Sequence, residues 1–109
     1  MIVTTAELND IPELTELLSI LFRQEVEFEP NVAAQEQGLR QIISNSSIGQ
    51  ILVARNHGKI LAMVNLLYTV STALGGRVCI LEDMVVRPEC RGQGIGQELL
   101  SVAIEYAQR

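Results

Sequence analysis

The fold and the site are both indicated by residues 84–100, which read MVVRPECRGQGIGQELL. An apolar strand ends in this stretch, a glycine-rich loop follows it, and an amphipathic helix begins after the loop. Gly92, Gly94 and Gly96 allow the backbone to turn sharply and to approach a ligand closely. The first turn of the following helix leaves its N–H groups unpaired, and such groups favour an anion. The stretch therefore predicts a binding site for a phosphorylated ligand, with a diphosphate as the best match.

The composition is that of a single folded domain covering residues 1–109. Hydrophobic residues make up 48% of the chain and charged residues 19%, which argues against disorder. The formal net charge is −5 and the lysines and arginines are scattered, so nucleic acid is not expected as a partner. The N-terminus lacks a basic signal segment and the longest uncharged run, residues 60–76, is broken by polar side chains. These features predict no membrane segment and a cytoplasmic protein.

The apolar periodicity of the chain predicts alternating helices and strands. We expect a strand at Ile2-Val3, helices over 10–23 and 31–44, strands over 50–55, 60–72 and 77–86, and a helix over 93–108. In the first helix the pattern puts Glu13, Glu16 and Ser19 on the solvent side. The buried face is predicted to consist of Ile11, Leu14, Leu17, Leu18 and Leu21. The acidic link at Glu25, Glu27 and Glu29 is either a solvated surface or a collar for a cationic substrate.

The glycine spacing excludes two common phosphate motifs. Residues 92–97, GQGIGQ, fail the dinucleotide fingerprint G-x-G-x-x-G, because Gln97 stands where the third glycine is needed. A P-loop requires a lysine followed by serine or threonine after the last glycine, and the chain has neither there. Cys79 and Cys90 match no zinc framework and are expected to be free thiols.

The spacing that does fit is R-x-x-G-x-G, formed by Arg91, Gly94 and Gly96 directly after a strand. This arrangement resembles the acyl-CoA site of the GCN5-related N-acetyltransferases, and the strand sequence of residues 80–86, ILEDMVV, resembles the polyamine and small-amine members. The resemblance covers nearly the whole chain. It implies an α/β (α+β) fold in which helices flank a mixed, mainly antiparallel sheet, in the order β-α-α-β-β-β-α.

The resemblance also implies acetyl-CoA as cosubstrate and assigns its contacts. The backbone amides that would hold the pyrophosphate belong to Arg91, Gly92, Gln93, Gly94, Ile95 and Gly96. The strand residues beside the pantetheine arm would be Met84, Val85 and Val86, with main-chain groups of Met84 and Val86 pairing with the arm. Met84 would also offer its backbone to the oxyanion of the transition state.

Glu82 and Asp83 are the catalytic candidates for transfer of the acetyl group to an amine. Glu82 interrupts an apolar strand, where a carboxylate holds a proton more readily, and it lines up with a substrate-side glutamate of the polyamine enzymes. Regular strand alternation allows only one of the two carboxylates to face the substrate, unless a bulge intervenes. The competing interpretation pairs one carboxylate with Arg77 or Arg87 and leaves the other in water.

Members of the family normally continue beyond the cofactor helix, so the C-terminal strands and helix are expected to be missing here. The general acid can then not be assigned. The apolar strand over 77–86 would be left at an edge, which a longer gene product or a second copy of the chain would cover. The leading function is N-acetylation of a small-molecule or peptide amine, and the alternative is a non-catalytic acyl-CoA-binding or assembly module.

Overall fold

The structure is a computed structural model that describes residues 1–24 and 31–108. Its elements are β1 (Ile2–Thr5), η1 (Leu8–Asp10), α1 (Ile11–Arg23), α2 (Val32–Ser44), β2 (Gly49–Asn56), β3 (Lys59–Ser71), β4 (Gly76–Val86), η2 (Pro88–Cys90) and α3 (Ile95–Ala107). This order confirms the predicted one and adds two short 3-10 helices. The acidic link at Glu25, Glu27 and Glu29 lies outside the described residues.

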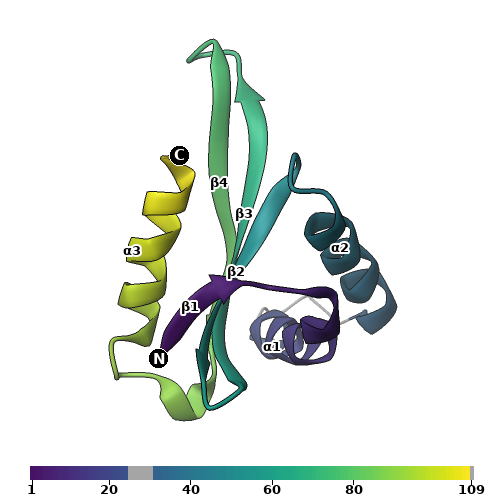
Figure 1. The fold of residues 1–109 in the computed structure, drawn as a ribbon. Coiled ribbons are helices and arrows are strands. Elements are labelled where there is room, and N and C mark those ends of the chain that lie inside the picture. Colours follow the sequence, from purple (N-terminus) through teal and green to yellow (C-terminus); the bar gives the residue numbers. More distant parts are fainter. Residues whose placement is uncertain (25–30, 109) are drawn as a thin grey trace.

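The four strands form one antiparallel sheet in the order β1-β2-β3-β4. Helices cover both of its faces, with α3 on one side and α1 with α2 on the other (Figure 1). Alternate side chains of β2 point to opposite faces of the sheet: Ile51 and Val53 pack toward α1 and α2, whereas Leu52 and Ala54 pack toward α3. The domain therefore has two hydrophobic clusters separated by the sheet.

The strand β4 lies at the edge of the described sheet and carries the residues of the predicted site. The register of β3 with β2 ends at Leu67, and beyond it β3 and β4 extend together past β2 as a hairpin arm. Ile80 and Leu81 on this edge are 48% and 37% exposed. Covering of the edge by a second copy of the chain stays a prediction.

The apolar face of α1 is as predicted, but Ser19 is not on the solvent side. Its side chain is buried between the helices, where its hydroxyl donates to Oε1 of Gln35 on α2 at 3.3 Å. The expectation was wrong because α2 packs across this side of α1. A pair of polar residues thus lies between the two helices beside the core.

The third helix begins two residues later than predicted, at Ile95 instead of Gln93. Gly94, the residue before it, has φ +80°, a left-handed conformation that cannot be part of an α-helix. Gln93 therefore belongs to the loop. Each of the three described α-helices has 13 residues, and none is long and apolar enough to span a membrane.

Candidate functional site

The glycine-rich loop and the start of α3 surround a cavity of about 420 Å³. It is lined by Val86, Cys90, Arg91, Gly92, Gly94, Ile95, Gly96 and Gln97. Six of these residues were predicted as cofactor contacts, whereas Cys90 and Gln97 were not. Gln93, Met84 and Val85 are not part of the lining. Gln97 lies about one helical turn after Gly94, and this spacing could have predicted that it lines the same cavity.

Backbone N–H groups in this loop are available to a ligand. Among the described residues, the N–H groups of Gly92, Gln93 and Gly94 donate to no protein acceptor, and neither do those of the first three residues of α3, 95–97. Gly94 is the N-cap of α3 and has no side chain with which to cap the helix. A row of free donors at the positive end of a helix can bind an anion.

Gly96 has a second role, in packing α3 against β4. A Cβ atom at this position would lie 3.4 Å from Cγ2 of Val86 and 3.6 Å from Cε of Met84. These are ordinary contact distances, so alanine would fit, but a larger side chain would push α3 away from the strand. Met84 therefore packs against the first turn of α3, on the α3 side of the sheet.

The end of β4 presents one backbone edge to the loop. The N–H of Arg87 donates to the carbonyl oxygen of Leu61 on β3 at 2.8 Å, so by strand alternation the N–H of Val86 points to the free edge. Nε of Arg91 donates to the carbonyl oxygen of Val86 at 3.2 Å, which places its side chain against the strand. The side chain of Val85 is buried on the α1 side, so only its backbone is near the loop.

A β-bulge interrupts β4 at the two predicted catalytic residues. Asn65 of β3 pairs with Glu82 and Met63 pairs with Val85, so Asp83 and Met84 both lie opposite Val64. Asp83 has φ +55°, a left-handed conformation that aspartate tolerates better than most residues. The extra residue reverses the alternation: Cys79 and Met84 both pack on the α3 side, although a regular strand would place them on opposite sides.

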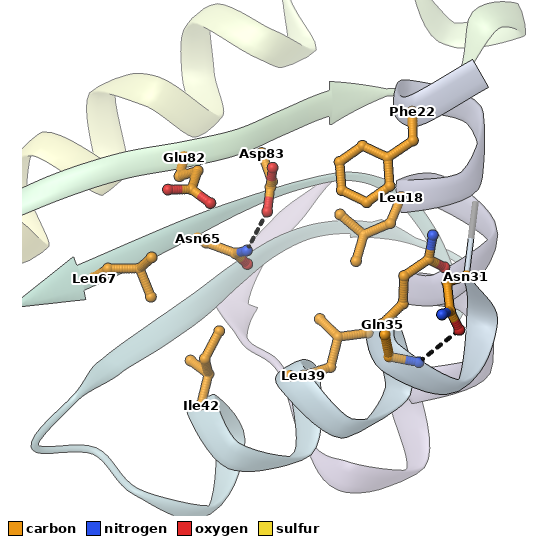
Figure 2. A pocket seen from close by; sticks show the side chains of 12 residues that line it. Leu18, Phe22, Asn31, Gln35, Leu39, Ile42, Asn65, Leu67, Glu82 and Asp83 are labelled. Carbon is orange, nitrogen blue, oxygen red and sulfur yellow. Dashed lines mark hydrogen bonds between the residues drawn. The ribbon is translucent and has the colours of Figure 1, made fainter. Parts of the chain in front are cut away.

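Because of the bulge, Glu82 and Asp83 line the same cavity, on the side of the sheet that faces α1 and α2. This cavity has a volume of about 330 Å³, and its walls come from α1, α2, β3 and β4. Figure 2 shows both carboxylates close to Asn65, whose Nδ2 donates to Oδ2 of Asp83 at 3.0 Å. Both carboxylates were expected on one face only if a bulge intervened, and the bulge is present.

The surroundings of Glu82 differ from those expected. Its side chain is exposed at the rim of the cavity, so the predicted burial in an apolar strand is wrong. The expected partner arginines have other contacts: Arg77 stacks on the ring of Tyr68 at 4.0 Å, and Arg87 binds Glu16 and Glu13 at 2.6 and 3.4 Å. No further strand of the described sheet covers β4 at this point, because β4 lies at the edge of the sheet.

The comparison with protein families agrees with this geometry. The model of the acetyltransferase (GNAT) family matches residues 11–109, which include both cavities. The chain belongs to this family. In this chain residues 91–94 form the loop between η2 and α3, and the bulge precedes them on β4.

Individual relatives support the same assignment. Residues of this chain are 39% identical over 57 positions to an uncharacterized N-acetyltransferase, YhfO, of Bacillus subtilis, a match that spans 52% of the chain and 38% of the relative. The chain thus matches less than half the length of this curated relative.

Two solved structures share the fold. A Clostridium difficile protein described as a possible acetyltransferase has TM-score 0.88 and 17% identity, over 99% of this chain and 71% of its own. A predicted acetyltransferase from Clostridium acetobutylicum, solved with acetyl-CoA, has TM-score 0.82 and 20% identity, over 98% of this chain and 73% of its own. At these identities the two structures bear on the fold alone.

Proposed function

We propose that this GNAT domain is an N-acetyltransferase that moves the acetyl group of acetyl-CoA to a primary amine. The observation that carries the proposal is the position of two cavities on one edge strand. The loop cavity with its free N–H groups borders Val86, and the cavity with two carboxylates borders Asp83, three residues earlier on β4. Three strand residues span about 10 Å, so a ligand lying along this edge can reach from one cavity to the other.

The residues of the loop fit the diphosphate of coenzyme A. The amides of residues 92–97 would bind the phosphate oxygens, since none of them has a protein acceptor in the described residues. The free N–H of Val86 would pair with an amide oxygen of the pantetheine arm, in the manner of an added strand. The backbone of Met84 is the proposed contact of the thioester oxygen, and Val85 holds this part of the strand against the core.

The carboxylates would act on the amine. In the proposed reaction the amine nitrogen forms a bond to the carbonyl carbon, the bond between this carbon and sulfur breaks, and the amine loses a proton while the thiolate gains one. Asp83 is held by Asn65 and is the better positioned of the two candidates to accept the proton, directly or through water. Glu82 at the rim would attract the ammonium form of the substrate.

Coenzyme A binding tests the loop. Gly94→Val should weaken binding at least tenfold in a calorimetric titration, because the side chain blocks the approach of the diphosphate. Gly75→Val is the matched control, because the φ angle of Gly75 is +72° and that of Gly94 is +80°. A Cβ atom added at either glycine would meet no atom within 4 Å, but Gly75 lies in the hairpin arm, away from the loop. Equal affinity for both variants and the unaltered chain would contradict the loop assignment.

Thiol release with a panel of amines tests the chemistry. Asp83→Asn preserves the side-chain shape and tolerates a positive φ, so it should lower kcat by about 100-fold or more with little change in coenzyme A affinity. Glu36→Gln, an exposed carboxylate of α2 away from both cavities, is the control. Tight coenzyme A binding with no turnover of any amine would instead favour a non-catalytic acyl-CoA-binding module.

A further inference from the structure

Two buried amide side chains of the carboxylate cavity each keep one hydrogen-bonding group without a partner. Asn65 and Gln35 are 4% and 8% exposed and both line the cavity. Among the described residues, Oδ1 of Asn65 and Nε2 of Gln35 have no hydrogen-bond partner. Buried polar groups in proteins are nearly always paired, so two such groups at one cavity point to a ligand that pairs with them.

The chemistry of the unpaired group of Asn65 is fixed by its neighbour. The carboxylate of Asp83 can only accept a hydrogen bond, so the NH₂ group of Asn65 must face it. Nδ2 of Asn65 accordingly lies 3.0 Å from Oδ2 of Asp83. The group left over is therefore the carbonyl oxygen, which requires a donor. A protonated or neutral amine supplies such a donor beside the two carboxylates.

Gln35 offers the opposite kind of group. Its Oε1 accepts from the hydroxyl of Ser19 at 3.3 Å, which leaves Nε2 as a donor. The residue lies on α2, whereas Asn65 and the carboxylates lie on the strands across the cavity, as Figure 2 shows. A ligand that spans the cavity would thus meet an acceptor at one end and a donor at the other.

The wall between these two ends is apolar. It is formed by the side chains of Leu18, Phe22, Leu39, Ile42 and Leu67. No lysine, arginine or histidine is among the described lining residues, and both lining carboxylates lie on β4. Among the described lining residues, the far end offers a second ammonium group only neutral amides and hydrocarbon side chains, and it offers a carboxylate no cation, so both carry a desolvation cost.

We infer that the acceptor is a primary monoamine with an apolar body whose far end is uncharged. This inference rests on the proposed function and narrows its substrate. The amine nitrogen lies among Asn65, Asp83 and Glu82, the hydrocarbon part lies between α1 and α2, and an uncharged oxygen at the far end accepts from Gln35. Diamines, polyamines and amino acids are disfavoured by the same wall.

Four amines with one six-carbon chain test the inference, because they differ only at the far end. Hexylamine ends in a methyl group, 6-aminohexanol in a hydroxyl, 1,6-diaminohexane in an ammonium and 6-aminohexanoate in a carboxylate. In the thiol-release assay, kcat/KM should be at least tenfold higher for the two uncharged members than for the two charged ones. An equal or higher value for either charged member would overturn the inference and leave the proposed function standing.

A cavity-filling variant locates the binding. Gly38 lines the cavity and a built Cβ meets no atom within 4 Å, so Gly38→Leu adds a side chain to open space. The KM for hexylamine should rise at least tenfold, with coenzyme A affinity unchanged. Ala33→Leu adds the same side chain to an exposed position on the other side of α2 and should change neither value. An unchanged KM in Gly38→Leu would contradict the assignment.

Failure of the proposed function has a different outcome. If no amine supports thiol release, calorimetric titration of hexylamine and 1,6-diaminohexane into the full chain decides the inference without turnover. Binding of hexylamine that is at least tenfold tighter, and that Gly38→Leu abolishes, supports it. Absence of hexylamine binding, or a preference for the diamine, overturns it.

Discussion

Replacing Arg87 with methionine should destabilise the domain by about 2–4 kcal/mol. The side chain is only 6% exposed, and its Nε donates to the carbonyl oxygen of the fully buried Ile60 at 2.6 Å. A hydrogen bond from a charged group contributes about 1.5–3 kcal/mol, and methionine leaves this carbonyl without a donor. Glu16 and Glu13 are 58% and 36% exposed, so each ion pair adds about 0–1 kcal/mol, since water replaces the arginine.

Urea denaturation followed by circular dichroism measures this loss at pH 7. The midpoint should fall while the m-value stays constant, and the thermal midpoint should drop by roughly 10–20 °C. Lys59→Met is the matched control, because Lys59 and Glu89 form an exposed ion pair at 3.8 Å that should contribute less than about 0.5 kcal/mol. If Arg87→Met costs no more than the control, the idea that Arg87 ties α1 to the sheet is wrong.

Three further outcomes are expected. Burial works to raise the pKa of Asp10, but hydrogen bonds from Arg55 and a backbone N–H outweigh it and the pKa lies below its usual value. The stability that Asp10 contributes should therefore be complete above about pH 4 and be lost as pH falls through the folded pKa. In urea denaturation, the difference in unfolding free energy between the unaltered chain and Asp10→Asn should shrink from pH 6 to pH 2.5. A constant difference would contradict this. Burial raises the pKa of the Cys79 thiol, so its alkylation by iodoacetamide, followed by mass spectrometry, should still accelerate above pH 9, whereas a plateau by pH 8 would be inconsistent. Gly49→Ala should cost about 1–3 kcal/mol, because its Cβ would clash with the carbonyl oxygen of Leu66 on β3. Gly38→Ala meets no atom and should stabilise α2 by up to about 1 kcal/mol. Urea midpoints that shift in the same direction for both variants would refute the contrast.

Local sequence patterns were sufficient for the order of elements and for the loop cavity. The glycines at 92 and 94 have the positive φ angles that their positions imply, and the apolar period predicted the buried face of α1. The helix predicted over 31–44 begins one residue later, because Asn31 is its N-cap and the Asn31 side chain accepts from the N–H of Ala34. Each of these features depends on residues that are close together in the chain.

Features that depend on distant residues were not predictable in this way. The bulge at Asp83 depends on the register against β3, which no local pattern in ILEDMVV reports. Ser19 is buried because α2 packs over it, and Gln35 lines the cavity because α1 is its neighbour. The side chain of Arg87 joins β4 to two glutamates more than 70 positions earlier, a contact that only the folded chain reveals.

Because of the bulge, one catalytic candidate contributes nothing to the regular pairing of the sheet. Asp83 is the extra residue, so its deletion would restore regular pairing between β3 and β4. Met84 and Val86 would then keep their side of the sheet relative to Cys79, because the residue count between them would suit an unbroken strand. One carboxylate could thus be removed by shortening the chain by a single residue, and the side chains of both hydrophobic clusters would stay on their own sides of the sheet.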